Sequence, residues 1–95
     1  MKIPLTNIFA ETLRETLEEI AITQEEVAKH TGIPKQVLSS MKLGKRRCTP
    51  ENDLRLSQYF GTSEGYWLRL QLDHDIRLAK REKGSQIKKA VPHFA

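Results

Sequence analysis

The sequence predicts an all-α fold of five helices in a single domain of 95 residues. Apolar residues recur every three or four positions, as at Phe9, Leu13 and Leu17, which is the spacing of one helix face. A hydroxyl residue followed by proline marks a helix start at Thr49 and Pro50. Glycines follow the apolar stretches, where a helix must end. A chain of this size can bury a core but has no room for a deep substrate cavity as well.

The first helix is expected from Ile8 to Ile20, with Asn7 or Thr6 as its cap. Its inner face is expected to carry Phe9, Leu13, Leu17 and Ile20. Its other face is acidic and comprises Glu11, Glu15, Glu18 and Glu19. This face is either a solubilising surface or a docking surface for a basic protein.

The stretch from Gln24 to Leu43 predicts two short helices joined by a tight turn at residues 32–34. Thr23 and Glu26 form a capping box, and Gly32 ends the first helix in the left-handed region. The residues expected to face inward are Val27, Ala28, Ile33, Leu38 and Met41. Ala28 is small where two steeply crossed helices must nearly touch. This is the steric pattern of a helix-turn-helix.

The outer face of the second of these helices carries polar and basic side chains only. They are Lys35, Gln36, Ser39, Ser40 and Lys42. Gln can pair with an adenine edge, Lys with guanine, and Ser with several bases. Each residue alone could be an ordinary solvated helix position, but as a set they favour contact with the major groove of double-stranded DNA.

Positive charge is concentrated around this motif, although the whole chain has a net charge of only +4. Residues 27–49 carry six basic and no acidic side chains, and residues 80–95 carry five basic and one acidic. Such a local excess is typical of phosphate binding. In the loop after the motif, Lys45, Arg46 and Arg47 are expected to add affinity without sequence choice. Cys48 is expected to be a small hydrophobe tucked under this loop.

The fourth helix is expected from Pro50 to Phe60, capped by Thr49 and stopped by Gly61. Its apolar side comprises Leu54, Leu56, Tyr59 and Phe60. The fifth helix is expected from Glu64 to Lys80 or Lys83, capped by Thr62 or Ser63.

The fifth helix carries two rows of side chains. Trp67, Leu70 and His74 are expected to face the domain, and the second row comprises Leu68, Leu72 and Ile76. A second apolar row is either buried deeply in the monomer or forms a two-fold dimer contact, which we favour. Residues 1–83 are thus expected to form the helix-turn-helix domain with a dimerising C-terminal helix. Residues 84–95 are expected to form a flexible basic tail, in which Ile87, Val91 and Phe94 could order on a partner.

Several classes of protein are excluded by what the sequence lacks. There is no apolar run that could span a bilayer, and residues 1–7 lack the features of a secretion signal, so we expect a cytoplasmic protein. One cysteine and three distant histidines predict no metal site. No nucleophile lies beside a base and no glycine-rich phosphate loop is present, so we expect neither catalysis nor a cofactor.

Over residues 8–79 the sequence resembles the HigA-type (VapI-type) antitoxins of the Xre-like helix-turn-helix group. The most specific matching motif is Phe60-Gly61-Thr62-Ser63 followed by Trp67-Leu68 and Leu70-Gln71. The other matching pieces are Leu13-Arg14-Glu15, Ile22-Thr23-Gln24, Val27-Ala28, Gly32, Gly44-Lys45-Arg46-Arg47, Thr49-Pro50, Leu54-Arg55-Leu56 and Asp75.

The resemblance implies a lambda-repressor-like five-helix domain and a homodimer that binds a palindromic operator. It further implies repression of its own toxin–antitoxin operon and neutralisation of a basic, RelE-like (HigB-like) ribonuclease toxin. Carried over by position, the base-reading residues are Lys35, Gln36 and Ser40, and the backbone contacts are Ser39, Lys42, Lys45 and Arg46. The alternatives are a free-standing regulator without a toxin and a toxin-blocking module with weak DNA binding. For the toxin contact, the candidates are Glu11, Glu15 and Glu18.

The sequence departs from the pattern of this group at three places. Pro34 stands where a Ser or Thr often caps the recognition helix, so a capping bond is expected to be missing. Asp53 occupies a position that is usually small and apolar, which leaves the packing of the fourth helix open. The segment before the first helix lacks the usual His-Pro-Gly start.

Overall fold

The computed structural model describes residues 5–94, and residues 1–4 and 95 lie outside the described residues. The helices are α1 (Ile8–Glu19), α2 (Gln24–Thr31), α3 (Lys35–Lys42), α4 (Pro50–Phe60) and α5 (Tyr66–Ala90). No strand is present between residues 5 and 94, so the expected all-α, five-helix fold is confirmed. The expectations about the secretion signal and the start of the chain fall mostly on residues outside this range.

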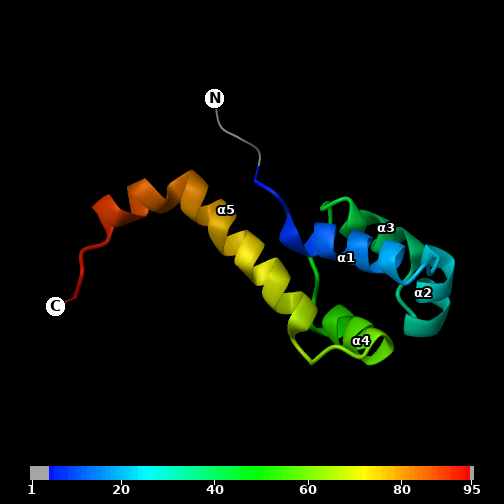
Figure 1. Cartoon of the computed structure of the whole chain (residues 1–95). Helices are drawn as coiled ribbons and strands as arrows, with labels where there is room; N and C mark the ends of the chain where they lie inside the picture. Colours follow the sequence, from blue (N-terminus) through cyan, green and yellow to red (C-terminus); the bar gives the residue numbers. More distant parts are fainter. Residues whose placement is uncertain (1–4, 95) are drawn as a thin grey trace.

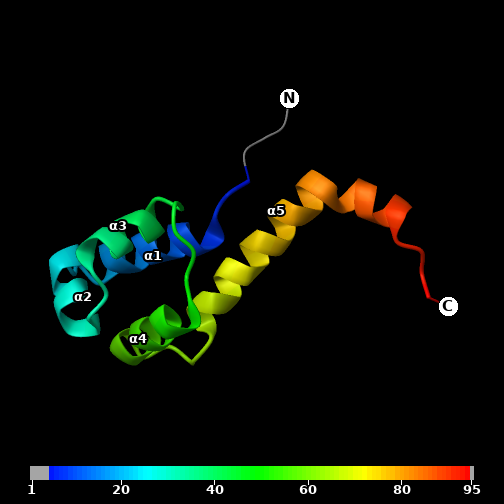
Figure 2. The ribbon, with the colours of Figure 1, turned by 180° about the vertical axis from the view of Figure 1, so that it is seen from behind.

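Helices α1 to α4 and the beginning of α5 form the body of the protein, and the rest of α5 extends away from it (Figure 1). Figure 2 shows the same arrangement from behind, with α3 in front of α1. The buried hydrophobic residues come from all five helices and from the loops between them. They are Phe9, Ala10, Leu13, Leu17, Val27, Ile33, Leu38, Met41, Cys48, Leu56 and Trp67. Within α5 only Trp67 and Gln71 are buried, so the helix belongs to the core at its first two turns alone.

Three helices begin with the side-chain caps that the sequence predicts. Oxygen atoms of Asn7, Thr23 and Thr49 accept the backbone N–H groups of Ala10, Glu26 and Asn52 at 3.1, 3.2 and 3.2 Å. Each bond satisfies a helix-terminal donor that has no partner inside the helix. Helices α2 and α4 end at glycines with positive φ, +77° and +75°, where a side chain would be strained.

Two apolar residues that were expected inside are exposed. Ile20 is 51% exposed because α1 ends at Glu19, which leaves Ile20 as the C-cap beyond the last helical turn. Leu54 is 49% exposed because the buried face of α4 runs through Asp53, Leu56 and Ser57 instead. A helix residue next to a buried one points about 100° away from it, so Leu54 faces outward.

The start of α5 differs from the prediction that Thr62 or Ser63 would cap it. The N-cap is Gly65, and the capping acceptor comes from another helix. The buried carboxylate of Asp53 on α4 accepts the N–H groups of Gly65 and Leu68 at 2.6 and 2.9 Å. The hydroxyl of Thr62 accepts the indole N–H of Trp67 at 3.1 Å instead. An acid at this position of α4 is therefore compatible with close packing, because it joins α4 to α5.

The C-terminal end of α5 also differs from the expectation. The helix was expected to end at Lys80 or Lys83, but it continues through Gly84 and Ser85 to Ala90. One Gly-Ser pair costs only about 1 kcal/mol of helix propensity, and Lys88 and Lys89 in the last turn favour the helix dipole. The expected boundary between the domain, residues 1–83, and the flexible tail, residues 84–95, therefore lies inside α5. None of the helices between residues 5 and 94 combines the length and the apolar character needed to cross a membrane.

Candidate nucleic-acid interface

Helix α3 is attached to the body by one apolar side and leaves the other side accessible. Leu38 and Met41 are completely buried, and Val37 packs against the same core. On the opposite side Lys35 and Gln36 are exposed. The remaining residues of the predicted DNA-contacting face are half-buried; they are Ser39, Ser40 and Lys42.

The beginning of α3 lacks a side-chain cap, as the sequence predicts for a proline in this position. Pro34 is the N-cap and makes no side-chain hydrogen bond to the helix. Its carbonyl oxygen accepts the N–H groups of Val37 and Leu38 at 3.0 and 3.1 Å. The turn between α2 and α3 is held by Thr31, whose hydroxyl accepts the N–H of Ile33 at 3.1 Å.

Gln24, the first residue of α2, connects α2 to both ends of α3. Its side-chain Nε2 donates to the carbonyl oxygen of Lys35 at 3.0 Å. Its Oε1 accepts from the ammonium group of Lys42 at 3.0 Å. The two helices are thus fixed to each other by polar contacts as well as by the core, and the Lys42 ammonium lies against α2.

Lys35, the most accessible cation of α3, forms an ion pair with Glu25 of α2. The distance from Nζ to Oε1 is 2.5 Å, and both side chains remain more than half exposed. The hydrogen bond from Lys35 and its positive charge lower the pKa of Glu25 below its ordinary value. The carboxylate is therefore ionised at neutral pH.

The end of α3 is held from α1. The guanidinium of Arg14 donates through Nη1 to the carbonyl oxygen of Lys42 in the last turn of α3. The N–H of Lys45 then donates to the carbonyl oxygen of Ser40 at 2.8 Å, and Gly44 between them has a φ of +75°. A cation at a helix C-terminus also favours the helix dipole. Lys45 and Arg46 follow this turn with their side chains exposed.

The third cation of the loop, Arg47, differs from its two neighbours because it binds α5. Its Nη2 and Nε donate to Oδ2 of Asp75 at 2.5 and 2.8 Å. Oδ1 of Asp75 accepts from Gln71 at 2.9 Å, and Gln71 accepts the N–H of Cys48 at 3.1 Å. Burial alone would raise the pKa of Asp75, but these hydrogen bonds and the charge of Arg47 together lower it. Arg47 therefore anchors the loop to α5.

Cys48 lies in the core at the end of this loop, as the sequence predicts. Its side chain is 1% exposed and packs with the apolar residues of the core. Burial and, to a lesser extent, the charge of Asp53 raise the pKa of its thiol to about 12. Such a thiol is not a nucleophile at neutral pH.

The polar residues that shape this site were not predicted from the sequence in these roles. They are Arg14, Gln24, Glu25, Gln71 and Asp75. Their contacts join residues far apart in the chain, and such contacts leave no periodic pattern. For Gln71 a signal exists, because a polar residue in the inward row of a helix must find a buried partner.

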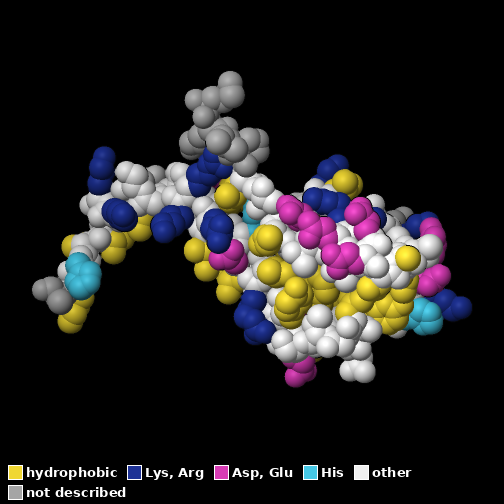
Figure 3. All heavy atoms as spheres, viewed as in Figure 1, with side chains coloured by type: hydrophobic (Ala, Val, Ile, Leu, Met, Phe, Trp, Pro, Cys, Tyr) yellow, Lys and Arg dark blue, Asp and Glu magenta, His cyan; other side chains and the backbone are white. Residues whose placement is uncertain are grey.

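Two further surfaces lie outside the α3 face. Side chains of α1 form an acidic surface, visible in Figure 3, that comprises Glu11, Glu15, Glu18 and Glu19. Burial and repulsion by the neighbouring carboxylates, Glu11 foremost, raise the pKa of Glu15. On α5, Leu72 and Ile76 are 51% and 56% exposed, and Leu68 of the same row is half-buried.

Comparison with known proteins identifies similar chains. The profile of the helix-turn-helix family HTH_3 matches residues 13–67. An uncharacterised HTH-type transcriptional regulator, YddM of Escherichia coli K12, is 34% identical over 71 residues, which cover 75% of this chain and 73% of YddM.

Solved structures show the same fold over nearly the whole chain. An addiction-module antidote protein of the HigA family from Coxiella burnetii superposes with a TM-score of 0.84 at 28% identity, covering 97% of this chain and 100% of its own. The antitoxin HigA of Pseudomonas aeruginosa, solved with the higBA promoter, superposes with a TM-score of 0.85 at 25% identity, covering 92% of this chain and 96% of its own.

Proposed function

The chain belongs to the Xre-like helix-turn-helix family, in its HigA/VapI-type group, and we propose that it is a dimeric repressor of its own operon that binds a palindromic operator through α3. Membership of this family makes it a DNA-binding regulator and not an enzyme. The observation that carries the proposal is the attachment of α3 by Leu38 and Met41, which leaves its polar and basic side accessible. Binding to chromosomal DNA would place the protein in the cytoplasm.

The residues of α3 and of the following loop divide into two groups by position. Lys35 and Gln36 are exposed and Ser40 is half-buried, and we assign base contacts to these three residues. We assign contacts with the sugar-phosphate backbone to Ser39, Lys42, Lys45 and Arg46. The two exposed cations of the loop support the second assignment, since they follow directly after the end of α3.

A palindromic operator requires two copies of α3 related by a two-fold axis. We assign the contact between the copies to the row Leu68, Leu72 and Ile76 of α5, because its last two members are exposed apolar side chains in the body-proximal half of the helix. Two recognition helices in successive major grooves on one side of the duplex would lie about 34 Å apart.

Binding measurements with two double variants test the DNA assignment. Duplexes taken from upstream of the protein's own gene are compared with random duplexes of equal length over a range of salt concentrations. Replacing Lys35 and Gln36 by Ala should lower the affinity for upstream DNA by about 10- to 100-fold per lost base contact. The affinity for random DNA should change little. Replacing Lys45 and Arg46 by Ala should lower the affinity for both kinds of DNA. It should also reduce the salt slope, the dependence of log affinity on log salt concentration, by about two. Equal effects of both variants on both DNAs would contradict the assignment.

We also infer that the acidic surface of α1 binds a basic, RelE-like toxin. Desolvation and, after it, repulsion by the neighbouring carboxylates raise the pKa of Glu15, and a cationic partner would relieve this repulsion. The similarity to proteins described as a HigA-family antidote and a HigA antitoxin supports the same inference. Helices α1 and α3 pack against each other (Figure 1), and Arg14 of α1 binds the last turn of α3, so the proposed toxin surface adjoins the proposed DNA surface.

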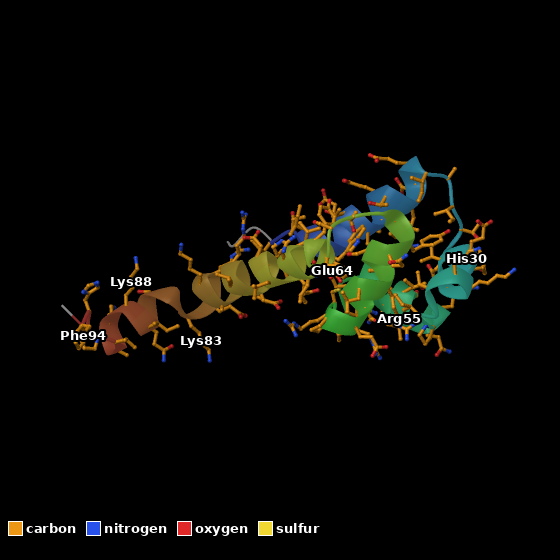
Figure 4. The ribbon with its side chains drawn as sticks, turned by 90° about the horizontal axis from the view of Figure 1, so that it is seen from below. His30, Arg55, Glu64, Lys83, Lys88 and Phe94 are labelled. Atoms are coloured by element: carbon orange, nitrogen blue, oxygen red, sulfur yellow. The ribbon has the colours of Figure 1, made fainter. Side chains whose placement is uncertain are left out.

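Charge reversal tests the toxin surface. Replacing Glu15 and Glu18 by Lys should abolish copurification with the basic toxin that we infer, and it should leave binding to upstream DNA intact. Glu64→Lys, at an exposed acid before α5, is the matched control (Figure 4). Toxin binding that survives the reversal would place the contact on another surface, with the segment around Ile87 to Phe94 as the next candidate. If no toxin gene lies beside the gene of this protein, the protein is a free-standing regulator. If the protein binds a toxin but shows no salt-sensitive DNA binding, it is a toxin-blocking module.

A further inference from the structure

The ion pair between Glu25 and Lys35 places a carboxylate at the predicted DNA-binding surface. Glu25 is the second residue of α2, and Lys35 is the first residue of α3. Their side chains meet at 2.5 Å across the turn of the motif, where both are exposed. Gln24, adjacent to Glu25, fixes the backbone of Lys35 through its carbonyl oxygen, so the pair forms between two positioned helix starts.

We propose that Glu25 is a specificity-determining residue, which keeps Lys35 from binding phosphates and releases it only to a base acceptor that replaces the carboxylate. This inference rests on the proposed function, because it requires α3 to enter the major groove. It concerns the discrimination between operator and random DNA, and not whether DNA is bound.

On random DNA the ion pair removes a favourable contact. A lysine beside a duplex normally gains affinity by neutralising a phosphate and releasing a counterion. Lys35 is already neutralised by Glu25, and the carboxylate itself is repelled by neighbouring phosphates. Non-specific binding is therefore weaker than the number of cations around α3 would give.

On the operator the balance changes. Guanine presents two acceptors, N7 and O6, on its major-groove edge, and a lysine can bind both. The pair with Glu25 is exposed to water and therefore weak, so the two acceptors of a guanine edge can replace the carboxylate at Lys35. A phosphate that approaches Lys35 is instead repelled by the charge of Glu25. A repulsive element that acts mainly on the wrong partner raises specificity without improving the right contact.

A charge-neutral variant and its matched control test the proposal. Glu25→Gln removes the partner of Lys35. Glu26→Gln removes the same charge from the adjacent, also exposed residue of α2. We expect Glu25→Gln to raise the affinity for random DNA by about five- to tenfold. It should also increase the salt slope by about one, since one more cation becomes available to bind phosphate. The affinity for upstream DNA should rise less, so the ratio of upstream to random affinity falls. Glu26→Gln should raise the affinities for upstream and random DNA by the same factor.

The same two substitutions in a Lys35→Ala background isolate the pair. There the difference between Glu25→Gln and Glu26→Gln should shrink, because no Lys35 remains to be released and only the repulsion between Glu25 and the phosphates is left. The proposal is overturned if the two substitutions already act alike when Lys35 is present, or if Glu25→Gln tightens upstream DNA as much as random DNA. If the unaltered protein shows no salt-sensitive binding to either DNA, the proposed function fails first, and this result is distinct from a missing difference between Glu25 and Glu26. Thermal melting of each variant verifies that it is folded.

Discussion

The carboxylate of Asp53 on α4 accepts the backbone N–H of Gly65, the residue that precedes α5, at 2.6 Å. The same carboxylate accepts the N–H of Leu68 at 2.9 Å, so one buried side chain satisfies two donors at the start of another helix. A negative charge in this position also favours the dipole of α5. Asp53 therefore fixes the position of the longest helix relative to the body.

We expect Asp53→Ala to lower the free energy of unfolding by about 3 kcal/mol, because two partly buried N–H groups lose a charged acceptor. For a domain of this size the melting temperature should fall by about 10 to 20 °C. Chemical denaturation followed by circular dichroism measures the loss. Glu51→Ala, which removes an exposed carboxylate paired with Arg55 on the same helix, should cost less than about 0.5 kcal/mol. A loss below about 1 kcal/mol for Asp53→Ala would show that this capping contact contributes little.

The end of α1 contains a backbone conformation that glycine would relieve. Ala21 has a φ of +52°, and the N–H of Ile22 beyond it donates to the carbonyl oxygen of Leu17 at 3.2 Å. We expect Ala21→Gly to raise the free energy of unfolding by about 0.5 to 1 kcal/mol, since the left-handed region costs a side chain more than it costs glycine. In the exposed interior of α5, Ala79→Gly should instead lower it by about 1 kcal/mol. Losses of equal size in both variants would contradict the assigned backbone strain.

The contact between Arg47 and Asp75 predicts a pH dependence of stability. Because the pKa of Asp75 is lower in the folded protein than in the unfolded chain, its contribution is fully present above about pH 4 and is lost as the pH falls below that. We expect Asp75→Asn to destabilise the protein by about 1 kcal/mol at pH 7, and the difference from the unaltered protein to shrink as the pH approaches 3.

Asp73→Asn serves as the control for this measurement. Asp73 pairs with Arg77 one turn along the surface of α5 at 2.9 Å, and it lies two residues from Asp75. Its replacement should change the stability at pH 7 by less than about 0.5 kcal/mol. Melting curves recorded from pH 3 to 8 give both comparisons. A constant difference between Asp75→Asn and the unaltered protein over this range would remove Asp75 as the titrating group.

The exposed apolar row of α5 predicts the oligomeric state. Replacing Leu72 and Ile76 by Glu should convert the proposed dimer to a monomer, because carboxylates cannot be buried unpaired in an apolar contact. Sedimentation equilibrium measures the mass, and the monomeric variant should also bind upstream DNA less tightly. Ile20→Glu, at an equally exposed apolar residue just after α1, should leave the mass unchanged. A monomeric unaltered protein, or a dimer that survives the double replacement, would contradict the assignment.

The parts of the fold that depend on local chemistry could be predicted from the sequence. The caps Thr23 and Thr49 and the stop at Gly32 depend on residues within one turn of each other and are predicted by the sequence, as is Asn7 as one of two candidate caps for α1. The start of α5 is not, because its acceptor, Asp53, lies twelve residues earlier on another helix. The end of α5 differs from the prediction because the helix propensity of the residues after Gly84 and Ser85 outweighs the local Gly-Ser signal.

The accessible side of α3 was likewise predictable from its helical spacing, but the partners of its cations were not. Lys35, Lys42 and Arg47 all belong to the basic stretch, and each meets a residue of another helix: Glu25, Gln24 and Asp75. A count of charges along the chain treats these cations alike. In the folded protein, the exposed Lys45 and Arg46 differ from them, which only the tertiary contacts reveal.

Helix α5 contacts the loop after α3 through Gln71 and Asp75, and the exposed residues Leu72 and Ile76 lie directly beside them in sequence. In two copies joined through this helix, α5 would therefore fix the distance between the two α3 helices. The number of base pairs between operator half-sites should then be a property of α5, whereas the half-site sequence is a property of α3. Exchanging α5 between relatives should transplant the preferred spacer length and leave the recognised bases unchanged.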